Sequence, residues 1–221
     1  MKREIILDAL VAIVQTGLEE ITTAFGESAE QQLAEKKSHT ETAVADLKVG
    51  KILVKKATEL LGNISILVEE TAPTSVNLKE YDLVIDPIDG TRAFLFNLPG
   101  TGCAVAWLED GKPVLSAIGQ LTATSAKDRF LLDIMCGGFI ENLWQAWTIK
   151  GAKRIPCHIS SKTLPGDFIV SVEMDAFDTA RENFMEGFKI AENLMPPKGS
   201  ARAIRMWGSS SLNFVVLGRG S

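Results

Sequence analysis

Residues 84–91, with the sequence Val-Ile-Asp-Pro-Ile-Asp-Gly-Thr, carry the side chains best suited to chemistry. An apolar, β-branched run ends at Asp86, and Asp89 follows three residues later. Pro87 removes a backbone donor and disfavours helix before it, so we expect a turn there that brings the two carboxylates together. With the backbone carbonyl of Ile88 they make an all-oxygen donor set, which suits Mg²⁺ better than Zn²⁺.

Two glycine-containing segments predict places where an anion binds. Gly90-Thr91 begins a predicted short helix, and the segment 208–211, Gly-Ser-Ser-Ser, stands between a predicted strand and a predicted helix. Backbone N–H groups at a helix start attract anions, and glycine lets an anion approach them closely. Metal-binding carboxylates beside such a helix start predict a phosphate ester that is held by both.

Each of these residues also has a purely structural interpretation. Asp-Pro and Asp-Gly are common turn formers, an exposed Glu69-Glu70 pair is typical of a solvated surface, and Gly-Ser-Ser is typical of a helix cap. His39 and His158 have no partners at ligand spacing, so we interpret both as structural. The functional interpretation depends on the joint order of an Asp, a Glu-Glu pair, the segment 86–91 and a Gly-Ser-Ser segment.

The hydrophobic patterning predicts an α+β first half, residues 1–150, and a partial α/β second half, residues 151–221. In the first half we expect helices at 3–24 and 43–61, strands at 64–68, 81–85 and 129–134, and a hairpin of 101–108 with 113–119. In the second half we expect a strand at 167–174, a helix at 177–194, a strand at 204–207 and a helix from 208, joined as a parallel unit. Residues 27–41 are polar and predict a loop.

Composition excludes several classes of protein. The chain has 28 acidic and 23 basic residues and a net charge of −5, which argues against a nucleic-acid partner. Its three cysteines show no Cys-x-x-Cys spacing, and we interpret them as reduced thiols of a cytoplasmic protein. The longest uncharged stretch, 93–108, is too short and too interrupted by Asn, Pro and Gly for a membrane span. The first residues fit an amphipathic helix better than a signal peptide.

With these motifs the chain resembles the inositol monophosphatase family, within the Mg²⁺-dependent, lithium-sensitive sugar-phosphatase superfamily. Asp-Pro-Ile-Asp-Gly-Thr at 86–91 is similar to its most specific signature. Three further segments are similar to family motifs: 42–46, a Thr-rich segment that ends in Asp; 67–70, with Val68 in place of the usual Gly of Gly-Glu-Glu; and 205–213, Arg-x-x-Gly-Ser. The likeness extends along the whole chain, more strongly at 42–118 and 202–218 than at 120–200.

The resemblance implies the layered sugar-phosphatase fold, with N-terminal helices on an antiparallel sheet followed by an α/β half that is incomplete here. It also implies a role for each matching residue. Glu69, Asp86 and the Ile88 carbonyl hold a first Mg²⁺, and Asp86 and Asp89 share a second, in a site of two or three ions that Li⁺ inhibits. Thr91, bonded to Asp46, orients and helps to deprotonate the attacking water. The phosphate is held by backbone N–H groups at the two helix starts, those of Gly90, Thr91, Ser209 and Ser210.

The sequence departs from the family at its end. The family has a later Trp-Asp motif whose Asp completes the second metal site, and this chain stops before it, at Ser221. Two explanations stay open: a shortened version or partial gene of a normal enzyme, which we favour, or a natural short form with a weakened second site.

The expected function is hydrolysis of a small polyol or sugar phosphate such as inositol-1-phosphate, by a homodimer. Histidinol phosphate, 3′-phosphoadenosine nucleotides and fructose 1,6-bisphosphate are alternative substrates within the superfamily. A non-catalytic scaffold that binds metal and phosphate is the alternative from another class.

Overall fold

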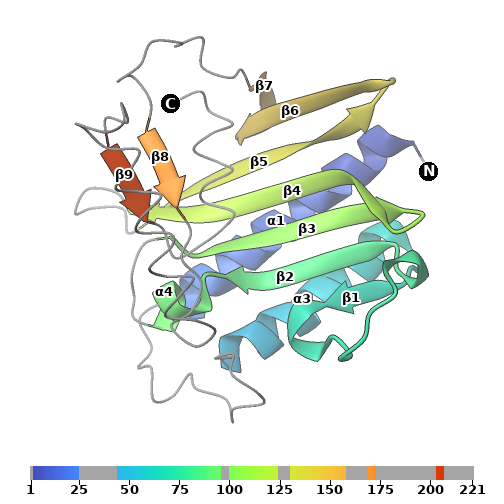
Figure 1. The fold of residues 1–221 in the computed structure, drawn as a ribbon, viewed down its shortest axis with the longest axis horizontal. Helices are drawn as coiled ribbons and strands as arrows, with labels where there is room; N and C mark the ends of the chain where they lie inside the picture. Colours follow the sequence, from blue (N-terminus) through green and yellow to red (C-terminus); the bar gives the residue numbers. More distant parts are fainter. Residues whose placement is uncertain are drawn as a thin grey trace, which may run out of the picture.

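A seven-stranded sheet with two long helices on one face dominates the structure (Figure 1). The computed structural model describes residues 2–24, 44–95, 100–123, 130–157, 169–172 and 203–206. The sheet follows the chain order: β1 (Ile66–Val68), β2 (Leu83–Asp89), β3 (Gly102–Glu109), β4 (Lys112–Ala123), β5 (Phe130–Ile140), β6 (Leu143–Lys150) and β7 (Lys153–Pro156). Only β1 and β2 pair in parallel; every other neighbouring pair of this sheet is antiparallel.

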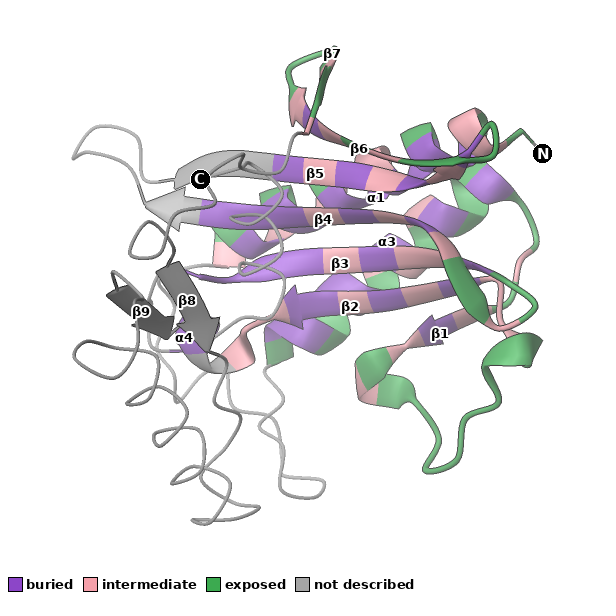
Figure 2. Ribbon diagram, turned by 45° about the horizontal axis from the view of Figure 1, so that its top comes forward, coloured by how far each residue is buried: buried purple, intermediate pink, exposed green. Residues whose placement is uncertain are grey.

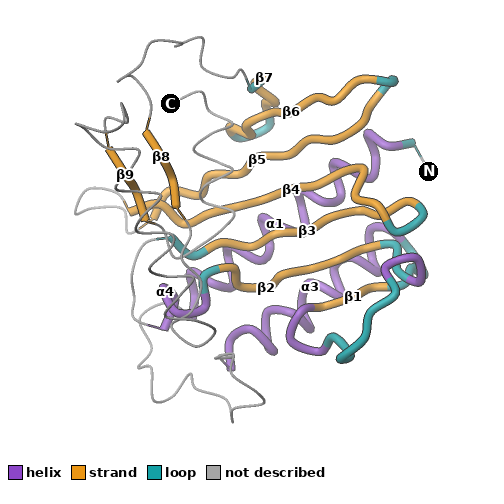
Figure 3. Tube along the Cα trace, in the orientation of Figure 1, coloured by secondary structure: helices purple, strands orange, loops and turns teal. Residues whose placement is uncertain are grey.

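The helices lie beside this sheet and at its ends (Figure 3). They are α1 (Arg3–Ala24), α3 (Val44–Leu61) and the short α4 (Thr91–Leu95), with single 3₁₀ turns η1 (Glu69–Thr71) and η2 (Leu78–Glu80). A second, two-stranded parallel sheet joins β8 (Ile169–Val172) to β9 (Ala203–Met206). Within the residues that the structure describes, no helix has the length and apolar character needed to cross a membrane.

The core lies between the two long helices and one face of the sheet. On α1 the fully buried apolar residues recur at helical spacing: Leu7, Leu10, Ile13, Val14, Leu18 and Ile21. They pack on alternate residues of the strands, such as Ile85, Val105 and Ala117. Figure 2 shows buried and half-buried residues alternating along the central strands. A Cβ atom at Gly119 would lie 2.5 Å from Cγ1 of Val14, so glycine lets α1 rest directly on β4. Burial of side chains of this size stabilises the fold by roughly 1.5–3 kcal/mol each.

The fold confirms the predicted layering of helices on a mostly antiparallel sheet. Both long helices, the short helix from Thr91 and the parallel pairing of the strands near 170 and 205 are where the sequence predicts them. The β3–β4 hairpin turns at Asp110 and Gly111, both with positive φ, as a two-residue hairpin turn requires. The predicted helices at 177–194 and from 208, and the predicted loop at 27–41, lie outside the described residues.

Two details of the sheet differ from prediction. The predicted turn at Pro87 is wrong: β2 continues to Asp89, and its pairing with β3 is irregular between Asp86 and Asp89. A bulge of this kind tolerates proline because no ladder hydrogen bond is needed there. Strands β6 and β7 were not predicted, and β7 carries the sheet slightly beyond residue 150.

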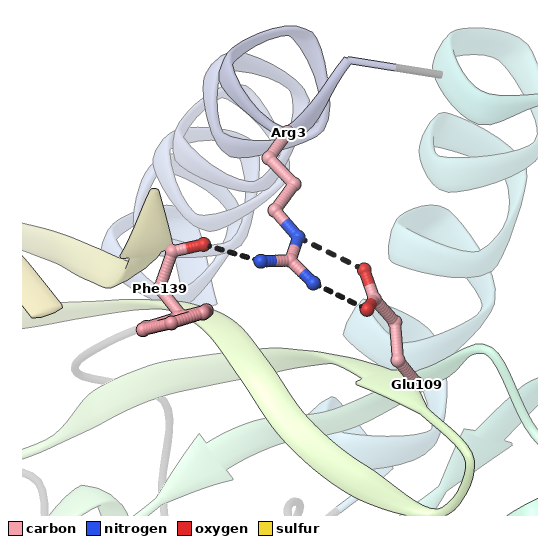
Figure 4. A network of polar contacts seen from close by, with 3 residues as sticks. All are labelled: Arg3, Glu109 and Phe139. Carbon is pink, nitrogen blue, oxygen red and sulfur yellow. Dashed lines mark hydrogen bonds and ion pairs between the residues drawn. The ribbon is translucent and has the colours of Figure 1, made fainter. Parts of the chain in front are cut away.

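Arg3 ties the first turn of α1 to two hairpins (Figure 4). Its Nε donates to Oε1 of Glu109 at 3.0 Å, its Nη2 pairs with Oε2, and its Nη1 donates to the carbonyl oxygen of Phe139 at 2.7 Å. The guanidinium carbon also lies 5.6 Å from the centre of the Phe139 ring. One side chain therefore fixes the start of α1 against the β3–β4 turn and the end of β5.

We expect Arg3→Met to lower the melting temperature by roughly 1–3 °C, since a bidentate pair at a partly exposed site contributes modestly. Part of the difference should disappear in high salt, which screens the ion pair. Lys55→Met is the matched control, because Lys55 and Glu59 are 4.0 Å apart and largely exposed. Thermal unfolding followed by circular dichroism measures both, and an equal effect of the two variants would contradict the special role of Arg3.

Candidate active site

The first two carboxylates of the site stand side by side at the ends of paired strands. Val68 of β1 is in register with Ile85 of β2, and this is the last pair of the two parallel strands. The residues that follow, Glu69 and Asp86, therefore leave the pair at the same edge. Parallel strands place their carboxyl ends together, which is why two segments distant in sequence meet here.

Helix α3 brings a third carboxylate to this edge. A Cβ atom at Gly50 would lie 3.3 Å from both Pro87 Cγ and Val68 Cγ1, so α3 contacts β1 and β2 at this point. Asp46 lies one helical turn earlier on the same face of α3, and its side chain is completely buried. Its position in the first turn of the helix favours a negative charge there.

Asp86 is the electrostatic centre of the cluster. Burial first, and then the nearby carboxylates of Glu69, Asp89, Glu70 and Asp46 in that order of effect, together raise the pKa of its carboxyl group to about 9. Among the described residues, Oδ1 of Asp86 is buried and has no hydrogen-bond partner. A buried, unpaired carboxylate oxygen among other carboxylates is the donor chemistry that a hard divalent cation prefers.

Glu70 belongs to this cluster, although the sequence analysis did not select it. Burial raises the pKa of its carboxyl group, the charge of Glu69 raises it further, and a hydrogen bond with the Asp46 side chain opposes the shift. The sequence signal that could have identified Glu70 was the Glu-Glu pair at 69–70, from which only Glu69 was selected as a metal ligand. In the part of the chain that is described, no three Asp, Glu, Cys or His side chains stand in ready-made metal geometry, so proximity rather than coordination defines the cluster.

The turn from β2 into α4 positions three more of the predicted site residues, Asp89, Gly90 and Thr91. Asp89 ends β2 in register with Gly102 of β3, and Gly90 follows with φ of 84°, a conformation that glycine adopts without strain. The carbonyl of Gly90 accepts the first helical bond of α4, from Phe94 N at 3.0 Å. The N–H groups of the first turn of α4 thus begin immediately after Asp89.

The Thr91 hydroxyl lies in the turn that follows β2. Its Oγ1 donates to the carbonyl oxygen of Ile88 at 3.1 Å. Asp46, to which the family resemblance implies a bond from Thr91, has a side-chain hydrogen bond with Glu70. A carbonyl oxygen has two lone pairs, so that of Ile88 keeps one for a cation. The other predicted phosphate-binding residues, Ser209 and Ser210, lie outside the described residues.

Cys103 lies under the cluster without being a nucleophile. Its thiol is completely buried, and burial, followed by the charges of Asp86 and Asp89, raises its pKa far above the usual value. A thiol in that state is inert. Its response to both aspartates is further evidence that they lie close together.

The comparisons with known proteins agree with this fold. The inositol monophosphatase family model matches residues 2–221, so the chain belongs to the inositol monophosphatase family. The curated 3′(2′),5′-bisphosphate nucleotidase CysQ of Haemophilus influenzae is 38% identical over 87 residues, which are 38% of this chain and 32% of the nucleotidase. The chain therefore matches about a third of the length of that relative.

Solved structures share the fold over nearly the whole chain. The extragenic suppressor protein SuhB of Bartonella henselae superposes with a TM-score of 0.72 at 18% identity, over 97% of this chain and 75% of that one. Mycobacterium tuberculosis SuhB gives a TM-score of 0.71 at 15% identity, over 99% and 75%. At these identities the likeness establishes the layered fold, with the sheet and helices described above.

The pKa of Asp86 predicts how stability depends on pH when a chelator is present. In the unfolded chain the carboxyl ionises near 3.8, and in the folded protein near 9. Between these values the native state binds more protons, so the free energy of unfolding falls as pH rises from about 4 to about 9. Asp86→Asn should flatten this decline and be more stable than the wild type at pH 8.

Urea unfolding at several pH values measures this dependence. Asp110→Asn is the control, because Asp110 is an exposed carboxylate at the opposite hairpin. It should keep the decline of the wild type. A decline that persists unchanged in Asp86→Asn would contradict the assignment.

Proposed function

We propose that this chain is a Mg²⁺-dependent phosphomonoesterase that hydrolyses a small polyol or sugar phosphate. The observation that carries the proposal is the gathering of four carboxylates around Asp86, beside the start of α4. Membership of the inositol monophosphatase family supports it. Gathering so many like charges is costly, since Asp46 is completely buried and Glu70, Asp86 and Asp89 are half-buried, and a function that uses them as cation ligands accounts for their presence.

The cluster offers ligands for two cations. Glu69, Asp86 and the Ile88 carbonyl would hold one Mg²⁺, and Asp86 with Asp89 would hold a second. Bound Mg²⁺ supplies a water of lowered pKa and positive charge near the leaving oxygen. The unpaired Oδ1 of Asp86 supports its role as the residue shared by both positions.

Thr91 and the start of α4 supply the polar groups that act on the substrate side. The Thr91 hydroxyl donates its hydrogen bond to Ile88 O. The lone pairs of Thr91 Oγ1 therefore remain able to accept a hydrogen bond from the attacking water and to hold that water in line. Backbone N–H groups of Gly90 and Thr91 would bind the phosphate, with help from Ser209 and Ser210. No side chain needs to act as the nucleophile.

A nucleotide substrate is the second candidate. The local identity of 38% with a 3′(2′),5′-bisphosphate nucleotidase covers 87 residues and favours a phosphate on a ribose. Phosphate release from inositol-1-phosphate, 3′-phosphoadenosine 5′-phosphate, histidinol phosphate and fructose 1,6-bisphosphate separates the candidates. If the chain released phosphate from none of them but still bound Mg²⁺ and phosphate in calorimetry, the scaffold alternative would replace the enzyme.

Asp89→Asn should lower kcat/KM by at least about a hundredfold, since it removes the carboxylate that belongs to the second cation alone. Its Mg²⁺ binding should weaken in isothermal titration. Asp110→Asn makes the same chemical change at the far hairpin and should keep full activity. Activity that survives in Asp89→Asn would contradict the two-cation site.

Thr91→Ala should separate turnover from metal binding. We expect kcat to fall by about a hundredfold, because a group that positions the attacking water is lost. The Mg²⁺ affinity should stay near that of the wild type, because no charged ligand changes. An equal loss of metal affinity in Thr91→Ala and Asp89→Asn would show that Thr91 has no separate role.

A further inference from the structure

Gln120 of β4 is a buried side chain whose polar groups lack partners. It is completely buried. In the part of the chain that the structure describes, neither its amide nitrogen nor its amide oxygen has a hydrogen-bond partner. Burying both groups unpaired is unfavourable, because the amide loses its bonds to water and gains none. Such a residue in a strand whose other buried side chains within 112–121, those of Leu115, Ala117 and Leu121, are apolar points to a ligand.

The alternation of side chains along β4 shows on which face of the sheet Gln120 lies. Gly119 lies directly against Val14 and Leu18 of α1, so its neighbour Gln120 is on the opposite face of the sheet. Ser116 and Ile118, on the same face as Gln120, are only half-buried. On this face of the sheet, side chains of β4 are therefore partly exposed at Ser116 and Ile118 and fully covered at Gln120.

The register connects Gln120 to the carboxylate cluster. Asp89 of β2 pairs with Gly102 of β3, and Gly102 pairs with Gln120 of β4, so the three form one row across the sheet. Gly102 has no side chain to fill the space between the other two. Neighbouring strands are about 4.8 Å apart, which puts the backbones of Asp89 and Gln120 about 10 Å from each other. That distance suits opposite ends of a phosphorylated small molecule.

We propose that Gln120 binds hydroxyl groups of the leaving alcohol while the phosphate is held beside Asp89, an inference that rests on the proposed function. A carboxamide offers two donors and an acceptor and carries no charge. It therefore matches hydroxyl groups, which donate and accept, better than it matches a phosphate. Both a polyol ring and a ribose present such hydroxyls.

The test compares substrates that differ in hydroxyl groups. Gln120→Met keeps the length of the side chain and removes both amide groups. Relative to p-nitrophenyl phosphate, whose leaving group has no alcohol hydroxyl, kcat/KM for inositol-1-phosphate or 3′-phosphoadenosine 5′-phosphate should fall about five- to tenfold. The ester that shows the fall identifies a polyol or a ribose as the source of the hydroxyls. The melting temperature without ligand should rise, since two unpaired polar groups are gone.

Thr101→Val is the matched control. The Thr101 hydroxyl is also buried without a hydrogen-bond partner among the described residues, but Thr101 lies opposite Leu121, on the face toward α1. Thr101→Val should raise the melting temperature and leave the ratio of the two kcat/KM values unchanged. The inference is overturned if this control reproduces the change in ratio, or if Gln120→Met leaves the ratio unchanged.

A structural role for the amide would give a different result. If Gln120→Met lowered the melting temperature, or if both Gln120→Met and Gln120→Leu failed to fold, the amide would be bonded within the protein and the inference would be wrong. A wild type that hydrolyses none of the esters would refute the proposed function instead. The rise in melting temperature caused by inositol-1-phosphate, compared between wild type and Gln120→Met, then decides the role of Gln120, and an equal rise in both would overturn it.

Discussion

Mutual repulsion of clustered carboxylates is the constraint around which this structure is organised. Asp86 is half-buried where the pairing of β1 with β2 ends, and four other acidic side chains raise its pKa. Concentrated negative charge of this kind opposes folding unless protons or cations neutralise it. The free energy that offsets it comes from elsewhere, chiefly from the apolar layer between α1, α3 and the sheet. The apolar layer that stabilises the fold and the carboxylate cluster that opposes folding are thus separate, and the cluster is the part that offers ligands and reactive groups.

A single parallel pair makes the convergence possible. In an antiparallel pair, the residue after one strand lies beside the residue before the other, and Glu69 and Asp86 would be at opposite ends. Because β1 and β2 run in parallel, both acidic residues follow the last pair of these two strands and lie at the same end of it. The absence of a side chain at Gly50 then lets α3 approach closely enough to add Asp46. Three segments that are separate in sequence meet through one choice of strand direction and one small residue.

The predictability of these features follows the range of the interactions that determine them. Helices α1 and α3 and the β3–β4 hairpin depend on local periodicity and on the Asp110-Gly111 turn, so the sequence predicted them. The path of β2 through Pro87 depends on its pairing with β3, which no local pattern reveals. The β5–β6 turn at Glu141 and Asn142 has positive φ at both residues, and Glu is an unusual residue there, so β6 was missed. Glu70 was missed because its hydrogen bond with Asp46 joins two different elements, which no local pattern reveals.

The two faces of the sheet explain why the motif at 86–91 does not identify the substrate. The face toward α1 is apolar and sets the positions of the strands, and the strand ends carry the carboxylates that suit any phosphate ester. In the proposed function, recognition of the alcohol comes from groups beyond the phosphate, and the row from Asp89 through Gly102 to Gln120 lies on the other face. Nothing in the pairing of β2 with β1 depends on which residue occupies position 120. In the proposed function the reaction and the choice of substrate therefore rest on different residues of one sheet, and we expect substitutions at position 120 to change the substrate while the carboxylate cluster stays the same.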